Sequence, residues 1–220
     1  MLEIVYRRLG MGKNILTATI EIKGIRPLLW HVFGPDSLPL EKQERTGVAG
    51  HDPEEWRKTH AATKGGQLYL PGSYFFGTYI AGAKFIKKGK GSIQSMVSAT
   101  LQVLDDKVLV NRHLPEDIHE KPHKYYNADE ELVYIDVRSV RNPSTKARNI
   151  RYRVATCPGW ECKFSIMFDK TVVSRQEMHS AIIDAGKLSG IGDGRSVGYG
   201  RFEVLSFKIQ EEDNADETAS

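Results

Sequence analysis

Five glycines and two arginines are concentrated in residues 190–201 of this 220-residue chain. Glycine adopts positive φ easily and lets another backbone approach closely. Successive backbone N–H groups in such a loop can form a concave site for an anion. The loop therefore predicts a phosphate-binding turn, and the alternative is a long turn whose glycines only relieve strain. The residues given this binding role are Gly190, Gly192, Arg195, Gly198 and Gly200, and Arg201 lies beside them.

The elements around this loop exclude two familiar phosphate-binding motifs. No Gly-Lys-Ser/Thr follows, so the loop is not a P-loop, and it does not open a helix after a strand, as a dinucleotide fingerprint does. Upstream, Ser174 and Glu177 form a Ser-x-x-Glu capping box, and the apolar spacing that follows predicts a helix that ends at Gly186. Downstream, residues 202–207 alternate as a strand.

A second motif, Pro71-Gly-Ser-x-x-x-Gly77, lies in the first half of the chain. The Pro-Gly pair ends a strand, and Ser73 is placed to cap a helix that runs to about Lys84. Small residues in this helix, Gly82 among them, predict close packing against a sheet.

These two motifs resemble the RAMP superfamily of CRISPR-associated RNA-binding proteins. The glycine loop has that superfamily's form, Gly-apolar-Gly, a short spacer and Gly-aromatic-Gly. The Pro-Gly-Ser motif is similar to that of the backbone subunits of the Cascade-type (type I) and type III effector complexes. The resemblance covers residues 15–209 loosely and implies that the glycine loop and Ser73 contact RNA.

A basic segment spans the predicted strands at 132–140 and 149–156. Positive side chains on a protruding hairpin can follow a phosphate backbone, and the alternative is a hairpin whose charged edge prevents strand pairing. In the resembled backbone subunits, a hairpin called the thumb pushes between guide nucleotides, which implies that role for residues 132–156. The basic residues are Arg138, Arg141, Lys146, Arg148, Arg151 and Arg153, and we expect RNA contacts from Arg141, Lys146, Arg148 and Arg151.

The fold class that these elements predict is α+β, with a single ferredoxin-like or RRM-like βαββαβ core over residues 1–210. Two insertions interrupt it, at about 33–66 and 111–130, the first with a short helical segment near Glu54–His60. The remaining predicted strands are 15–23, two strands within 95–110, and 160–168, which is expected to pair back on the preceding strand through the turn at 157–160.

Charge is distributed unevenly along the chain. The formal net charge is +3, but residues 211–220 hold five acidic and no basic residues, so residues 1–210 carry +8. The acidic tail is predicted to be disordered, and a basic body suits a polyanionic partner. No membrane span or secretion signal is evident, so we expect a cytoplasmic protein.

Candidate catalytic and metal-binding residues are few. His31 with Ser37 or Tyr74 is an arrangement that can serve chemistry at an RNA 2′-hydroxyl. Three histidines and two cysteines match no zinc signature, so no metal or other cofactor is expected, and a disulfide between the cysteines stays open. These residues are His113, His119, His123, Cys157 and Cys162.

The function that follows from the resemblance is that of a CRISPR effector backbone subunit that coats single-stranded guide RNA. Its expected partners are guide RNA, target nucleic acid, further copies of the chain and other effector subunits. Two alternatives stay open. One is a metal-independent, guide-processing endoribonuclease of the same superfamily, and the other is a single-stranded nucleic-acid-binding protein of a phage or mobile element. Whether the chain is an enzyme is not decided by the sequence.

Overall fold

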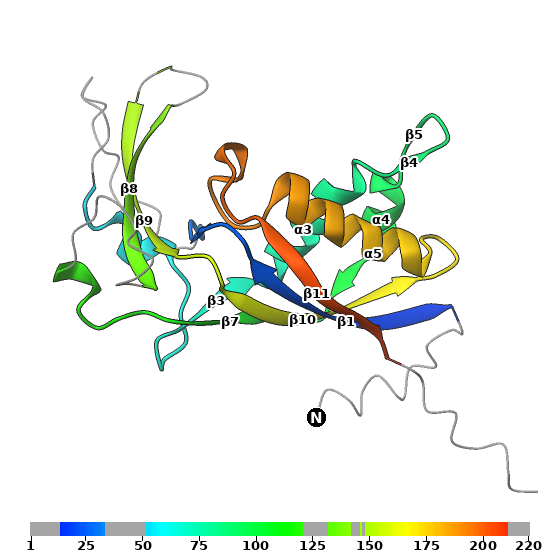
Figure 1. Ribbon diagram of the computed structural model, residues 1–220, viewed down its shortest axis with the longest axis horizontal. Helices are drawn as coiled ribbons and strands as arrows, with labels where there is room; N and C mark the ends of the chain where they lie inside the picture. The colour runs from blue at the N-terminus through cyan, green and yellow to red at the C-terminus, as the bar shows by residue number, and fades with distance from the viewer. Residues whose placement is uncertain (1–13, 34–51, 121–131, 142–145, 147, 211–220) are drawn as a thin grey trace, which may run out of the picture.

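The computed structural model describes residues 14–33, 52–120, 132–141, 146 and 148–210. It is a mixed α/β structure with antiparallel sheets, in which helices cover one face of a large sheet and a long hairpin stands beside that sheet (Figure 1). The acidic tail and most of the two predicted insertions lie outside the described residues. No helix within the described ranges has the length and hydropathy needed to cross a membrane.

The large sheet has six strands, and the five on its main path follow the order β11-β1-β10-β7-β3, with β6 pairing β10. Every pairing between these strands is antiparallel. The alternation predicted for the first strand is confirmed, because Ala18, Ile20 and Ile22 are fully buried. The strands are β1 (Ile15–Gly24), β3 (Gln67–Pro71), β6 (Gln102–Val103), β7 (Lys107–His113), β10 (Glu161–Asp169) and β11 (Phe202–Ile209).

Three helices pack on one face of this sheet, α3 (Gly72–Ala83), α4 (Gln94–Thr100) and α5 (Arg175–Asp184). Both hydrogen bonds of the predicted capping box, between Ser174 and Glu177, are present. The aromatic rings of Phe75 and Phe164 pack between α3 and the sheet, with their centres 4.3 Å apart and their planes tilted by 43°.

Two predictions about these helices are wrong. The helix does not end at Gly186 but continues as a π-helical segment, Ala185–Ser189, to Gly190, which has φ of 82°. Gly186 is needed for packing instead, since a Cβ there would lie 2.3 Å from the carbonyl oxygen of Phe202. Gly82 likewise fits helix α3 against α5 rather than against the sheet, because its Cβ would lie 1.9 Å from the carbonyl oxygen of Ala181.

A second sheet, with the order β2-β9-β8, is formed mainly by the hairpin of β8 (Val133–Arg141) and β9 (Arg148–Thr156). The chain enters it through β2 (Leu28–Leu29), directly after β1, and leaves it through residues 157–160 into β10. Strand β10 therefore pairs with β1 and not with β9 as predicted. The short connections from β1 to β2 and from β9 to β10 join the two sheets, and they hold the hairpin at one end of the large sheet.

Smaller elements complete the described chain. The helical segment predicted in the first insertion is present as α2 (Glu55–Thr59), and a 3₁₀ turn, Ile118–Glu120, follows β7. The basic turn after α3 forms the short ladder of β4 (Lys87–Lys88) and β5 (Gly91–Ser92). The two strands predicted around Asp105 and Asp106 are present as β6 and β7, but the first is shorter than predicted, since α4 occupies residues 94–100 and buries Val97.

Candidate nucleic-acid interface

The segment after β1 anchors both walls of the candidate site. Its Leu28 and Leu29 pair with β9, which fixes the base of the hairpin. The same segment accepts hydrogen bonds from the glycine loop, from Gly200 N to Pro27 O at 2.8 Å and from Asp193 N to Leu29 O at 2.9 Å. One short stretch of chain therefore sets the separation between the hairpin and the glycine loop.

The five glycines of the loop all adopt positive φ, between 65° and 92°. Four of them are closely packed, and Gly200 is the tightest, since a Cβ there would lie 1.7 Å from the carbonyl oxygen of Ile191. Gly198 differs, because no atom lies within 4 Å of its ideal Cβ position. Most of these glycines are thus required by the fold of the loop itself.

The backbone amides of the loop are mostly bonded within the protein. Ile191 N donates to Gly200 O, Gly190 N to Ala185 O, and Gly194 N to the Asp193 carboxylate. Between residues 190 and 200 of the described chain, only the amides of Gly192, Arg195 and Ser196 lack a protein acceptor. Only Arg195 and Ser196 thus offer two successive free N–H groups, and the other amides of the predicted site, apart from that of Gly192, are bonded within the protein. An anion bound here would be contacted mainly by side chains.

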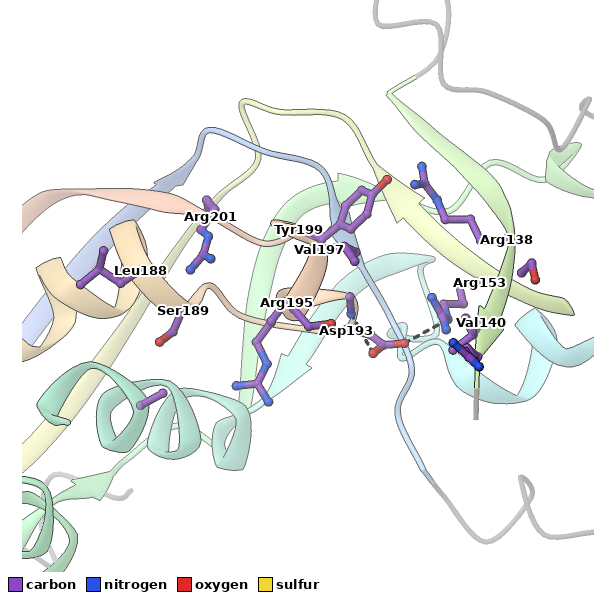
Figure 2. A pocket seen from close by; sticks show the side chains of 15 residues that line it. Arg138, Val140, Arg153, Leu188, Ser189, Asp193, Arg195, Val197, Tyr199 and Arg201 are labelled. Atoms are coloured by element: carbon purple, nitrogen blue, oxygen red, sulfur yellow. Dashed lines mark hydrogen bonds and ion pairs between the residues drawn. The ribbon is translucent and has the colours of Figure 1, made fainter. Parts of the chain in front are cut away.

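A cleft of about 930 Å³ separates the glycine loop from the hairpin (Figure 2). Among the described residues, the side chains of five arginines line it together with one acidic residue, Asp193. Its apolar lining comes from Val140, Val197 and Leu188, which are 37%, 73% and 50% exposed. The arginines are Arg138 and Arg141 on β8, Arg153 on β9, and Arg195 and Arg201 in the loop segment.

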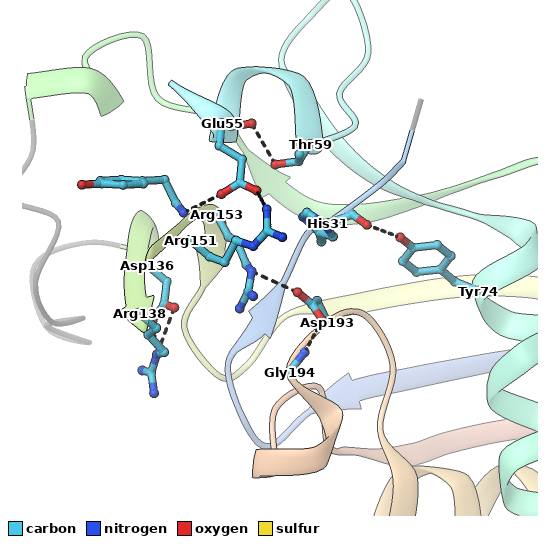
Figure 3. A network of polar contacts seen from close by, with 11 residues as sticks. His31, Glu55, Thr59, Tyr74, Asp136, Arg138, Arg151, Arg153, Asp193 and Gly194 are labelled. Carbon is cyan, nitrogen blue, oxygen red and sulfur yellow. Dashed lines mark hydrogen bonds and ion pairs between the residues drawn. The ribbon is translucent and has the colours of Figure 1, made fainter. Parts of the chain in front are cut away.

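Two of these arginines connect the hairpin to the loop (Figure 3). The Nε atom of Arg153 lies 3.0 Å from Oδ2 of Asp193, and the Arg153 side chain is 8% exposed. Arg138 donates from Nε to both carboxylate oxygens of Asp136, and its guanidinium lies 4.6 Å from the centre of the Tyr199 ring. These contacts hold the two walls together and neutralise part of the positive charge.

The other three cleft arginines, Arg141, Arg195 and Arg201, have no acidic group within ion-pair distance in the described chain. One guanidinium nitrogen of Arg201 is buried without a hydrogen-bond partner among the described residues. A buried cationic donor without an acceptor is costly unless a ligand supplies one. The cleft therefore retains a surplus of positive charge that is suited to an anionic ligand.

A smaller hollow of about 320 Å³ lies on the other side of Arg195. The sequence-predicted residues Ser73 and Gly192 line it together with His31 and Tyr74. The phenolic oxygen of Tyr74 donates to the His31 carbonyl oxygen at 2.9 Å. Burial lowers the pKa of His31, and the repulsion from Arg153 acts in the same direction. The imidazole is therefore neutral near pH 7 and able to accept a proton.

Ser73 does not have the capping role that the sequence suggests. Helix α3 begins at Gly72, its N-cap residue is Pro71, and no side chain caps it. A Cβ at Gly72 would lie 2.1 Å from the carbonyl oxygen of Asp105, so this glycine is required where the helix starts beside the sheet. Ser73 is exposed at the helix start and faces the hollow beside Arg195.

The remaining predicted hairpin residues do not line the cleft. Arg151 forms an ion pair with Glu55 of α2, and the same carboxylate accepts the backbone N–H of Tyr152 at 3.0 Å. Arg148 is exposed at the end of β9 opposite Arg141, and Lys146 is exposed with φ of 60°. The structure thus brings Arg141 and Arg195 to one cleft. The cleft is not lined by the other predicted residues, which are Lys146, Arg148, Arg151, Gly190, Gly192, Gly198 and Gly200.

The described residues contain no group of three or more side chains arranged to hold a metal ion. Cys157 and Cys162 are both buried free thiols, so the two do not form a disulfide. His113 and His119 belong to β7 and the following 3₁₀ turn, whereas His123 lies outside the described residues, as does Ser37.

The face of the large sheet opposite the helices has a different character. Lys and Glu alternate across its strands, and Lys23 lies 3.4 Å from Glu161 while Lys163 lies 2.9 Å from Glu21. These two lysines are therefore paired with glutamates, which reduces the attraction of this face for a polyanion.

No protein-family model and no curated protein matches this chain. Among solved structures, it is similar to a chain of the type III-B Cmr-beta complex bound to cognate target RNA. The identity is 15% and the TM-score is 0.47, with 96% of this chain covered. The match spans 66% of that chain, which is slightly less than two thirds of its length.

Several features of the cleft cannot be found from the sequence. The sequence places Arg138, Arg151 and Arg153 in one basic hairpin. It does not indicate that Arg138 and Arg153 line the cleft whereas Arg151 forms an ion pair with Glu55 of α2. Asp193 and the apolar residues Leu188 and Val197 give no sequence signal of a binding role. The one sequence signal for a binding role at Asp193 and Val197 is their place in the glycine-rich loop. Every residue of that loop shares this signal, so it does not single them out.

Proposed function

We propose that this protein binds single-stranded RNA in the cleft between the glycine loop and the β8–β9 hairpin. The observation that carries the proposal is the convergence of five arginines from three chain segments on one cleft with one acidic residue. Three of them, Arg141, Arg195 and Arg201, lack an acidic partner in the described chain. Basic residues clustered in this way neutralise phosphates and release counterions.

The shape and lining of the cleft favour a single strand over a duplex. Apolar side chains lie among the arginines, with Val197 73% exposed and Leu188 50% exposed. A single strand presents unpaired base faces that such side chains can cover, whereas a duplex presents mainly its phosphates. A cleft with arginines and exposed aliphatic groups therefore suits both parts of an unpaired nucleotide.

We propose further that the core is a ferredoxin-like βαββαβ unit that belongs to a RAMP-type subunit of a CRISPR effector complex. The order β11-β1-β10-β7, with α3 and α5 on one face, supports the ferredoxin-like part. The two motifs, Gly190-Ile-Gly … Gly-Tyr-Gly200 and Pro71-Gly-Ser … Gly77, support the RAMP part. The β8–β9 hairpin would then act as the thumb, and further copies of the chain and other subunits would assemble along the guide RNA.

Photo-crosslinking tests the location of the bound RNA. Single-stranded RNA carrying 4-thiouridine is irradiated with the full-length protein, and the crosslinked peptides are identified by mass spectrometry. We expect crosslinks in residues 138–141 and 188–201. Crosslinks confined to the face of the large sheet opposite the helices, such as residues 17–23 or 161–167, would contradict a binding site in the cleft.

The second hollow favours one other function, metal-independent cleavage of RNA. His31 is neutral near pH 7 because burial lowers its pKa, and Tyr74 and Arg195 line the same hollow. A neutral histidine can take the proton of a ribose 2′-hydroxyl, whose oxygen attacks the adjacent phosphorus to give a 2′,3′-cyclic phosphate and a free 5′-hydroxyl.

Incubation of repeat-derived RNA with the protein in EDTA tests this second function. Cleavage that leaves a 2′,3′-cyclic phosphate and is lost in His31→Ala would establish the endoribonuclease. For a backbone subunit we expect intact RNA, together with light scattering that grows with RNA length as copies bind side by side.

A further inference from the structure

Arg138 and Tyr199 form a contact that differs from every other arginine contact of the cleft. The Arg138 guanidinium lies over the Tyr199 ring, 4.6 Å from its centre. Its Nε atom donates to both oxygens of Asp136, at 2.7 and 2.9 Å, and Asp136 is itself buried. Two neighbours from different elements therefore fix the plane of this guanidinium.

The charge of Arg138 is already balanced, which makes it a poor phosphate ligand. The buried Asp136 carboxylate pairs with it directly, whereas Arg141, Arg195 and Arg201 have no such partner in the described chain. Binding of a phosphate at Arg138 would place that phosphate close to the Asp136 carboxylate, which costs like-charge repulsion. Arg138 must therefore contribute to the cleft through its planar surface and not through net charge.

That planar surface is accessible. The Arg138 side chain is 45% exposed and lines the cleft, and Figure 2 shows it beside Tyr199 at the hairpin side of the cleft. A guanidinium with one face on an aromatic ring can stack a second flat group on its other face. Nucleobases stack on arginine planes and on aromatic rings in single-stranded RNA complexes.

On the basis of the RNA-binding function proposed above, we propose that Arg138, held by Asp136 and backed by Tyr199, is a stacking platform for one unpaired nucleobase. The phosphates on either side of that base would be contacted by Arg141 on the hairpin and by Arg195 or Arg201 on the loop. With this platform, the cleft would bind a strand that carries bases more tightly than an abasic strand of equal charge, whatever the base sequence.

The test compares two ligands of equal length and charge, oligo(rU) and the corresponding abasic ribose-phosphate chain. Dissociation constants are measured for the wild type and for Arg138→Lys, which keeps the charge and loses the plane. We expect the preference for oligo(rU) over the abasic chain to fall about tenfold in Arg138→Lys. The salt dependence of binding to the abasic chain should remain that of the wild type, because the charge is kept. An equal loss of affinity for both ligands would mean that Arg138 only holds the cleft together and would overturn the platform.

Arg141→Lys is the matched control, because Arg141 lies on the same strand and lines the same cleft but has no aromatic ring beneath it in the described chain. Its preference for bases should equal that of the wild type. An unchanged preference in Arg138→Lys, with strong salt-dependent binding of both ligands, would contradict the platform alone. Failure of the wild type to bind either ligand at low salt would contradict the proposed function itself, and the platform with it.

Discussion

The cleft and the helix-free face of the large sheet both carry basic residues, but in opposite arrangements. On the sheet face, Lys23 and Lys163 each lie beside a glutamate on the neighbouring strand. In the cleft, arginines brought together from β8, β9 and the glycine loop outnumber the one acidic residue. Net charge along a sequence does not separate these cases, because only the pairing in space decides where positive potential remains.

The largest loss of stability is expected from disrupting the glycine loop, which forms one wall of the cleft. In Gly200→Val, the new Cβ would lie 1.7 Å from the Ile191 carbonyl oxygen at a φ of +65°. We expect the free energy of unfolding to fall by about 4 kcal/mol or more, measured by denaturant titration.

Gly198→Ala is the matched control in the same loop. Its φ is +92°, but no atom lies within 4 Å of the new Cβ, so only backbone strain opposes it. We expect a loss of about 1–2 kcal/mol. Equal losses in both variants would mean that the loop does not pack as described.

A smaller effect is expected from breaking the ion pair that joins the two walls. Asp193→Ala leaves the Arg153 guanidinium, only 8% exposed, without its carboxylate partner. We expect a loss of about 2 kcal/mol in the free energy of unfolding, less than for a fully buried pair because Asp193 is 34% exposed.

The matched change on the sheet face is Glu161→Ala. Its pair with Lys23 is 44% exposed on both sides, and exposed pairs of this kind contribute at most about 1 kcal/mol. A thermal or denaturant melt in which Glu161→Ala costs as much as Asp193→Ala would remove the distinction between the two regions.

A still smaller effect, on RNA affinity, is expected from changes at the outer end of the hairpin. Lys146 and Arg148 are exposed and do not line the cleft. The double change Lys146→Ala and Arg148→Ala should reduce affinity only for RNA long enough to extend past the cleft along the hairpin, by up to two phosphate contacts. Fluorescence anisotropy with short and long RNA measures this, and an equal loss for both lengths would place these residues in the main site.

The smallest expected effect is a pH dependence of stability from His31. Burial lowers its folded-state pKa below the ordinary value of 6.5, so the unfolded chain binds the proton more readily. The free energy of unfolding should therefore fall as pH decreases below about 6.5, and this part of the fall should be absent in His31→Asn. Denaturant melts at about pH 7.5 and 5.5 compare the two proteins. Identical pH dependence in both would show that His31 is not buried as neutral imidazole.

Local signals in the sequence were sufficient for much of the fold. The capping box of Ser174 and Glu177 fixed the start of α5, and alternation fixed the buried face of β1. The segment 94–100 was misassigned, because the apolar and polar residues that alternate from Val97 to Val103 also suit a strand and the helical packing depends on tertiary contacts.

The candidate site was less predictable, because its properties depend on contacts between distant segments. Arg151 and Arg153 are two residues apart on one strand, yet one pairs with Glu55 and the other with Asp193. The glycine spacing indicated a special loop, but whether its amides face a ligand or the protein depends on Pro27 and Leu29, far away in the sequence. Sequence reasoning located the loop and could not identify which charges remain unpaired.

The most direct test of a cleft that binds RNA compares two triple variants with the same change in charge. One replaces Arg141, Arg195 and Arg201 by Gln, and the other replaces Lys23, Lys163 and Lys208 of the sheet face by Gln. The slope of log affinity against log salt is measured for single-stranded RNA. We predict that the cleft variant flattens the slope by about 0.7 for each lost contact, up to about two in total, and that the sheet-face variant keeps the wild-type slope. Equal slopes in the two variants would contradict the account.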